Sequence, residues 1–230
     1  MVIYEKAALQ IQCCGNQYST KINTAAKSVF LNAAVYNELR KQIIMIENEF
    51  KLMLDCGQYE KLLTVYKFKT FVQTNHYYDT DDLSMSAKSV TIRVRDLDDK
   101  HFLQMKLPTG KSYSRIELST EIPDVPENIP SEKLSSLLNS SAFDFPDVKL
   151  LGALKTTRNV YKFDGGEVDL DKSEYFGKID YEAEIEFTNE TAARKILHEI
   201  KETLNINPQS DVCTGKIHRF LEEYRSGRHG

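Results

Sequence analysis

Acidic and basic side chains recur at every second position in several segments of the chain. Residues 45–54 carry Glu47, Glu49 and Lys51 at this spacing, and residues 90–96 carry Arg93 and Arg95. Side chains two positions apart on a β-strand point to the same face, so each segment would present one ionic face. Carboxylates are ligands of hard divalent cations, whereas guanidinium and ammonium groups bind phosphate oxygens. The pattern therefore predicts metal and phosphate chemistry.

The candidate groups come from at least six such segments and carry both signs of charge. The candidate substrate-binding cations are Lys51, Arg93, Arg95, Lys106, Arg115 and Arg158, with Lys216 joining them from a predicted helix. The candidate metal ligands are Glu47, Glu49, Glu117, Asp171, Glu182 and Glu184. A triphosphate would satisfy the cations and one or two Mg²⁺ or Mn²⁺ ions would satisfy the acids.

Eight segments alternate between apolar and polar residues and are predicted to be β-strands. They cover residues 45–54, 71–78, 90–96, 102–107, 114–122, 154–163, 167–171 and 179–187. Residues 98–100 and 164–166 are typical of short turns, so the strands beside them should form antiparallel hairpins. Helical patterns at 58–68, 132–138, 191–204 and 216–224 are too few to alternate with the strands. The predicted fold class is α+β, built on one large antiparallel sheet or barrel.

The ionic strand faces allow two interpretations. An antiparallel sheet often packs one face on helices and exposes the other to water, which would make the charges a solvated surface. Exposed strands usually mix Thr, Ser, Gln and Lys, however, and these faces are almost entirely charged. If the strands close into a barrel with their apolar faces outward, the charges line its interior. Burying unpaired ions costs several kcal/mol each, so that interior must hold water or a charged ligand.

Composition excludes several functional classes. The 230 residues contain 30 Lys and Arg against 34 Asp and Glu, a formal net charge of −4, which argues against broad binding of nucleic acid. No apolar run approaches the roughly 18 residues that a membrane-spanning helix needs. The four cysteines form no CxxC pair and the N-terminus lacks a signal sequence, so a cytoplasmic location is expected.

The first 44 residues differ from the rest in their pattern of apolar and polar residues. Residues 24–40 carry apolar side chains at helical spacing and predict one helix, and strict alternation starts near Met45. We expect an N-terminal extension over 1–44 and a single domain over 45–228. The alternatives for the extension are a regulatory helix, a segment foreign to the natural protein and a misassigned start.

Six short motifs follow one another along the predicted domain. They are Glu47-Asn48-Glu49-Phe50-Lys51, His76-Tyr77-Tyr78-Asp79-Thr80, Ile92-Arg93-Val94-Arg95, Gln104-Met105-Lys106 followed by Arg115-Ile116-Glu117 and Arg158, Tyr181-Glu182-Ala183-Glu184-Ile185-Glu186, and residues 216–219. In type and order they resemble the ExExK, YYDT, paired-arginine, tunnel-lysine, acidic closing-strand and terminal-helix segments of the CYTH superfamily. These proteins are also called triphosphate tunnel metalloenzymes, and the chain is most similar to their small single-domain bacterial members.

The resemblance implies a fold, an activity and a site. The fold is an eight-stranded antiparallel tunnel with helices packed outside. The activity is metal-dependent hydrolysis of a triphosphate-containing small molecule with Mg²⁺ or Mn²⁺, in which Glu49 and Lys51 are the expected catalytic residues. Neither nucleic acid nor a membrane is an expected partner. Two alternatives remain: a class IV-type adenylyl cyclase that forms cyclic AMP from ATP, and a non-catalytic polyphosphate-binding module, which could dispense with the acids.

Overall fold

The computed structural model describes residues 43–109, 112–137, 145–207 and 214–227. All of them belong to the second of two compact units, residues 31–230. The helix predicted over 24–40 lies outside the described residues.

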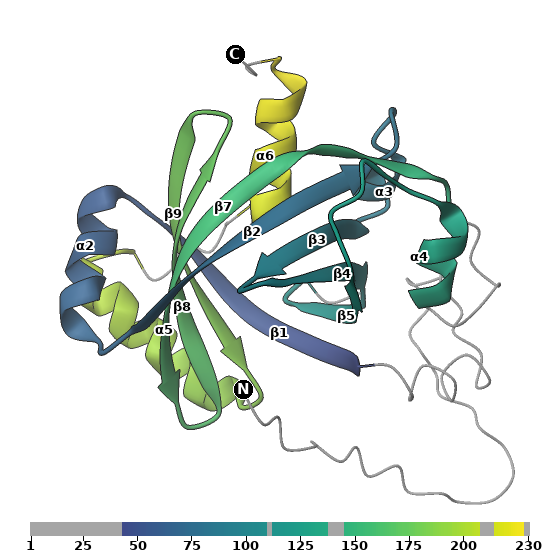
Figure 1. The fold of residues 1–230 in the computed structure, drawn as a ribbon. Helices are drawn as coiled ribbons and strands as arrows, with labels where there is room; N and C mark the ends of the chain where they lie inside the picture. The colour runs from purple at the N-terminus through teal and green to yellow at the C-terminus, as the bar shows by residue number, and fades with distance from the viewer. Residues whose placement is uncertain (1–42, 110–111, 138–144, 208–213, 228–230) are drawn as a thin grey trace, which may run out of the picture. The chain divides into compact units, whose positions relative to one another are not determined.

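Eight antiparallel strands close into a barrel, which confirms the predicted fold class (Figure 1). They run in the order β2-β3-β4-β5-β1-β9-β8-β7, and β7 pairs back with β2. A two-residue strand, β6, adds to the edge of β7 and was not predicted. The strand bounds are β1 Ile43–Leu54, β2 Lys69–Asp79, β3 Thr91–Leu97, β4 Lys100–Pro108, β5 Ser114–Ile122, β6 Asn128–Ile129, β7 Val148–Phe163, β8 Gly166–Tyr175 and β9 Lys178–Phe187.

Both predicted hairpins are present. β3 pairs with β4 across residues 98–99, and β7 pairs with β8 across residues 164–165. The second turn requires glycine. Gly165 has a φ of +94°, and a Cβ at Gly166 would lie 2.2 Å from the carbonyl oxygen of Glu186 on the next strand.

Five helices occur in the described part of the chain, and four of them correspond to predicted helical segments. Their bounds are α2 Cys56–Val65, α3 Ser84–Ala87, α4 Ser131–Leu137, α5 Glu190–Leu204 and α6 Lys216–Arg225. α2 begins earlier than predicted because Asp55 forms a capping box with Gln58. It ends at Val65 because Tyr66 is extended and leads the chain into β2. No helix of this part is both long and apolar enough to cross a membrane.

The apolar strand faces point outward and are covered by helices. Val168, Leu170 and Ile185 pack against Leu62 of α2 and Ile200 of α5, and all five are fully buried. A second outer cluster packs Val94, Met105 and Leu118 against Leu134 and Leu137 of α4. Each fully buried aliphatic side chain contributes roughly 1.5–3 kcal/mol, so this arrangement turns the ionic faces inward.

A third apolar cluster covers one end of the barrel interior. Tyr77, Leu154 and Tyr175 share strand faces with the ionic residues of β2, β7 and β8, yet they pack against α6. The ring of Phe220 lies 4.9 Å from that of Tyr77 and 6.0 Å from that of Tyr175. α6, drawn in yellow in Figure 1, therefore covers this end of the interior.

Candidate metal and phosphate site

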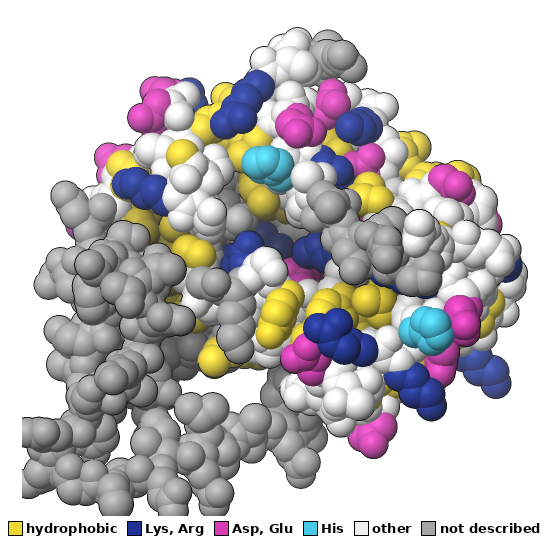
Figure 2. All heavy atoms as spheres, turned by 180° about the vertical axis from the view of Figure 1, so that it is seen from behind, with side chains coloured by type: hydrophobic (Ala, Val, Ile, Leu, Met, Phe, Trp, Pro, Cys, Tyr) yellow, Lys and Arg dark blue, Asp and Glu magenta, His cyan; other side chains and the backbone are white. Residues whose placement is uncertain are grey.

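Strand register brings the predicted site residues onto one inward face. Lys51 lies opposite Glu184, Arg158 opposite Asp171, and Lys106 opposite Glu117. Directly opposed residues on antiparallel strands point to the same side of the sheet, so these pairs meet inside the barrel. Figure 2 shows a hollow on the rear face, with Lys and Arg side chains and an acidic side chain at its bottom.

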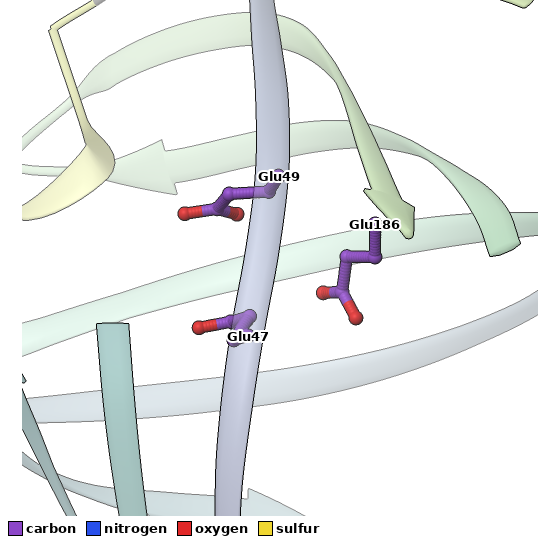
Figure 3. A group of neighbouring side chains, drawn as sticks. All are labelled: Glu47, Glu49 and Glu186. Atoms are coloured by element: carbon purple, nitrogen blue, oxygen red, sulfur yellow. The ribbon is translucent and has the colours of Figure 1, made fainter. Parts of the chain in front are cut away.

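The first acidic group contains Glu47 and Glu49 from β1 and Glu186 from β9 (Figure 3). One carboxylate oxygen from each lies within 4.8 Å of the other two. Lys51 Nζ is 2.9 Å from Glu49 Oε2, and Lys106 pairs with Glu47. Among the described residues, Glu186 pairs with one cation, Arg158, whose Nη1 lies 3.9 Å away. The three carboxylates are therefore crowded together, with little positive charge close to Glu186.

Asp169 lies beside this group, and its Oδ2 pairs with Arg158. The carboxylate of Asp169 lies near those of Glu167 and Glu186, and one oxygen of each lies within 4.8 Å of the other two. Burial, opposed by Arg158, raises the pKa of Asp169 to about 7. Burial, followed by the charges of Asp169 and Glu47, also raises the pKa of Glu186 well above its ordinary value. Asp169 Oδ1 is buried without a hydrogen-bond partner among the described residues. An orphaned oxygen among crowded carboxylates fits a bound divalent cation.

Lys51 lies between the two acidic groups and keeps its proton. It pairs with Glu49 and with Glu184. Burial alone would lower its pKa, but these two carboxylates hold the pKa of Lys51 above its ordinary value. A lysine in this state supplies positive charge and cannot act as a general base at neutral pH.

The second acidic group is in direct contact with three basic side chains, and burial lowers the pKa of one of them, Lys216, to about 7. Asp171, Glu182 and Glu184 are buried, with oxygens within 4.8 Å of one another. Arg158 binds Asp171 through Nε at 2.9 Å and Nη2 at 2.6 Å, and its Nη2 also lies 2.6 Å from Glu184. Lys216 of α6 contacts all three carboxylates. Arg219, one turn along α6, donates from Nη2 to Glu182 at 2.6 Å.

The opposite wall of the barrel is cationic. Arg93 donates from Nε to Gln104 at 2.8 Å, and its Nη2 lies 3.3 Å from Glu117. Arg95 Nε donates to the side-chain oxygen of Asn75 at 3.0 Å, and no carboxylate in the described part of the chain pairs with it. Burial, followed by the charges of Arg93 and Arg158, lowers the pKa of Arg95 to about 10. Its guanidinium is thus charged at neutral pH without a matching anion.

Arg115 lies at the start of β5, opposite Glu47 in register. Its Nη1 donates to the carbonyl oxygen of Ser114 at 2.9 Å, so its guanidinium contacts the chain beside the β4–β5 turn. The other predicted site residues meet within the interior. Arg115 is the predicted cation that the structure places at the edge of this arrangement, beside Glu47.

Four charged residues of these groups in the described part of the chain were not among the predicted site residues: Glu167, Asp169, Glu186 and Arg219. The three acids continue the same alternation, and Arg219 follows Lys216 by three positions. The signal was present in the sequence, because Asp169 and Asp171 share a strand face, as do Glu184 and Glu186. Sequence spacing alone does not say which acids lie nearest the cations.

Known proteins match this chain in sequence and in fold. A family model for the CYTH domain matches residues 45–220. YjbK of Bacillus subtilis (strain 168), provisionally named a triphosphatase, is 31% identical over 186 residues, which cover 78% of this chain and 96% of YjbK.

Solved structures agree in fold. A protein from Bacillus halodurans, provisionally named an adenylate cyclase, has a TM-score of 0.60 and 27% identity over 77% of this chain and 98% of its own. HpAC1 from Hippeastrum is provisionally named an adenylyl cyclase and described as having a dominant triphosphatase activity. Its structure has a TM-score of 0.55 and 24% identity, and the match covers 79% of this chain and 96% of HpAC1. The second likeness concerns the fold alone. With its ordered motifs, its closed barrel and a family match over most of its length, this chain belongs to the CYTH domain family.

Proposed function

We propose that this protein is a metal-dependent hydrolase of triphosphate-containing substrates. One observation carries the proposal: crowded carboxylates, whose burial and mutual repulsion hold the pKa of Glu186 well above its ordinary value, face a guanidinium that no carboxylate in the described residues pairs with. Arg95 lies on β3 and Glu186 on β9, and these strands are four apart in either direction around the ring of eight. A polyphosphate bound through a divalent cation complements both walls, because the cation meets the acids and the phosphate oxygens meet the guanidinium.

The metal-binding residues in this proposal are Glu47, Glu49 and Glu186, with Asp169 beside them. Their donor set is made only of carboxylate oxygens, which suits Mg²⁺ or Mn²⁺. When bound, such an ion neutralises phosphate oxygens and polarises the phosphorus that is attacked. The predicted ligands Glu117, Asp171, Glu182 and Glu184 instead orient the cations of the site in this account.

The phosphate-binding residues are Arg93, Arg95 and Lys106 on one wall, with Lys51 between the walls. Lys106 Nζ lies 3.3 Å from Glu117 as well as contacting Glu47, so it holds a fixed position near both the acids and the arginines. Preorganised cations of this kind stabilise charge that grows on the transferred and leaving phosphates, and each is worth about 3 kcal/mol. The role of Lys51 is electrostatic, because its ammonium stays protonated.

YjbK supports the reaction class, since it is provisionally named a triphosphatase and shares 31% of its residues with this chain over nearly its whole length. The Bacillus halodurans protein carries a cyclase name instead, so the two activities have to be separated by their products.

Product analysis tests the proposal. Purified protein is incubated with tripolyphosphate, thiamine triphosphate or ATP, with Mg²⁺, Mn²⁺ or EDTA. We expect orthophosphate from at least one substrate, only in the presence of metal. Pyrophosphate together with cyclic AMP from ATP would identify a cyclase, and tight tripolyphosphate binding without any product would identify a binding module. Either result contradicts the proposal.

A further inference from the structure

The two arginines of β3 are each held at Nε by an amide side chain from a neighbouring strand. Arg93 Nε donates to Gln104 Oε1 on β4 at 2.8 Å, and Arg95 Nε donates to Asn75 Oδ1 on β2 at 3.0 Å. Asn75 lies opposite Arg95 in register, so its side chain shares the inward face. A neutral acceptor thus takes the Nε edge of each guanidinium and leaves the terminal nitrogens for other contacts.

The terminal nitrogens of the two arginines differ in their surroundings. Nη2 of Arg93 lies 3.3 Å from Glu117, which supplies an opposite charge. Among the described residues, Asn75 is the hydrogen-bond partner of Arg95, and no carboxylate pairs with it. The guanidinium of Arg95 is therefore fixed in place through one edge without being neutralised.

An amide at position 75 favours orientation over stability. Asn75 is 1% exposed, so the contact is shielded from water. An aspartate has nearly the same shape and would give Arg95 a charge-assisted hydrogen bond, which is roughly twice as strong as a neutral one. Arg158 on the adjoining strand β7 shows this alternative, because its Nε and Nη2 bind the carboxylate of Asp171. The amide instead leaves the charge of Arg95 available to a ligand.

We propose that Asn75 is a positioning residue for Arg95. Its amide oxygen fixes the guanidinium through Nε, directs the terminal nitrogens towards the phosphates of the substrate and leaves the positive charge uncompensated. The contact between Arg95 and phosphate rests on the function proposed above. The effect of Asn75 on the buried charge of Arg95 does not, because stability also reports it.

Asn75→Asp is the first test, because it keeps the acceptor and adds a negative charge. The melting temperature should rise, since the buried cation gains an anionic partner. The affinity for tripolyphosphate, measured by titration calorimetry in metal-free buffer, should fall at least about tenfold, and KM for Mn²⁺-dependent phosphate release should rise accordingly. A merely structural role would not move stability and binding in opposite directions. Asn128→Asp adds the same charge at an exposed position and should match the wild type in all three.

Asn75→Leu shows whether Asn75 acts through Arg95. This variant removes the acceptor, so both the melting temperature and the affinity for tripolyphosphate should fall. In an Arg95→Met background the same change should alter the affinity by less than about twofold, because the group that Asn75 positions is gone. A full additional loss of affinity in the double variant overturns the proposal. A lower melting temperature or an unchanged affinity in Asn75→Asp also overturns it.

The outcomes keep this inference separate from the proposed function. Metal-dependent phosphate release by the wild type, with unchanged affinity in Asn75→Asp, would support the function and overturn the role of Asn75. Binding of tripolyphosphate without release, with the expected loss of affinity in Asn75→Asp, would contradict the function and support the role of Asn75. A wild type that neither binds nor hydrolyses tripolyphosphate would contradict both.

Discussion

At the scale of single residues, the interior of the barrel is arranged by the matching of charge. Arg158 and Lys216 contact one set of acids, Lys51 contacts both sets, and the described cation that pairs with Glu186 lies 3.9 Å away. On the far wall, Arg93 pairs with a carboxylate, that of Glu117. Arg95 instead donates a hydrogen bond to the amide oxygen of Asn75. We expect ionic side chains without an oppositely charged partner in the described chain to bind ligand, because the ligand then supplies the opposite charge.

Replacing Arg95 should separate activity from stability. Arg95→Met removes a buried cation that no described carboxylate pairs with, although it leaves the buried oxygen of Asn75 without its hydrogen bond, so stability should change less than in Arg93→Met. The rate of phosphate release should fall by about 100-fold, in line with the loss of one preorganised donor. Arg93→Met is the matched comparison on the same strand. It leaves Glu117 and Gln104 without their partner and should lower the free energy of unfolding by about 1–3 kcal/mol. A large loss of stability in Arg95→Met would contradict the unmatched-charge account.

The pH dependence of stability should reveal the crowded acids. The folded-state pKa of Asp169 is about 7, above its ordinary value of 3.8, so the folded state binds more protons than the unfolded state between these values. Stability should therefore fall as pH rises from about 4 to 7. In EDTA, we expect the melting temperature to decrease by several degrees across this window. Asp169→Asn should flatten the decrease, and saturating Mn²⁺ should reverse it. A melting temperature that rises over the same window in EDTA would contradict the assignment.

At the scale of secondary structure, tight turns and strand register place the acids. β8 must pass close to β9 for Asp169 to reach Glu186, and Gly166 allows this approach because it has no side chain. The α6 helix places Lys216 and Arg219 one turn apart, so both reach acids of β8 and β9.

Gly166→Ala should damage the metal site without touching a ligand. The added Cβ would lie 2.2 Å from the carbonyl oxygen of Glu186, so β9 must move at that residue. We expect a lower melting temperature and weaker Mn²⁺ binding in an isothermal titration. Gly57→Ala in α2 is the control, because a Cβ there meets only the side chain of Asp55 at 3.4 Å, so it should lower neither quantity. Equal Mn²⁺ affinity in both variants would show that this approach does not position Glu186.

The helices and strands were largely predictable, and the partners of each site residue were not. Alternation predicted the ionic faces of β1, β3 and β9, and turn residues predicted two hairpins. The start of β7 was missed because residues 148–153 do not alternate strictly, although they pair with β2 and β6. Which acid lies beside Lys216 depends on how α6 packs against β8 and β9, and residues more than 30 positions apart meet there. Local patterns contain no information about such contacts.

At the scale of the described domain, the barrel places crowded carboxylates and the guanidinium of Arg95 on opposite walls, and α6 covers one end. The interior changes from ionic to apolar towards that helix, where Tyr77 and Phe220 pack. Substrate would then enter and leave from the other end, with its phosphates leading.

Residues 1–42 should be dispensable for the reaction. The first described strand begins at Ile43, and the family match begins at residue 45. A chain that starts at residue 43 should release phosphate at a rate within about twofold of the full chain, since every proposed site residue and the whole family match lie after that point. A much slower rate at equal folded fraction would assign a catalytic or regulatory role to the first 42 residues.

The central claim is that the acids of β1 and β9 hold a divalent ion on which triphosphate hydrolysis depends. The most direct test measures Mn²⁺-dependent phosphate release from tripolyphosphate in the wild type, Glu49→Gln, Glu186→Gln and the exposed control Lys100→Ala. Each Gln variant keeps the side-chain shape and removes one ligand charge. The account predicts at least a roughly 100-fold loss in both Gln variants with folding intact, and no loss in Lys100→Ala. Full activity in both folded Gln variants would contradict it.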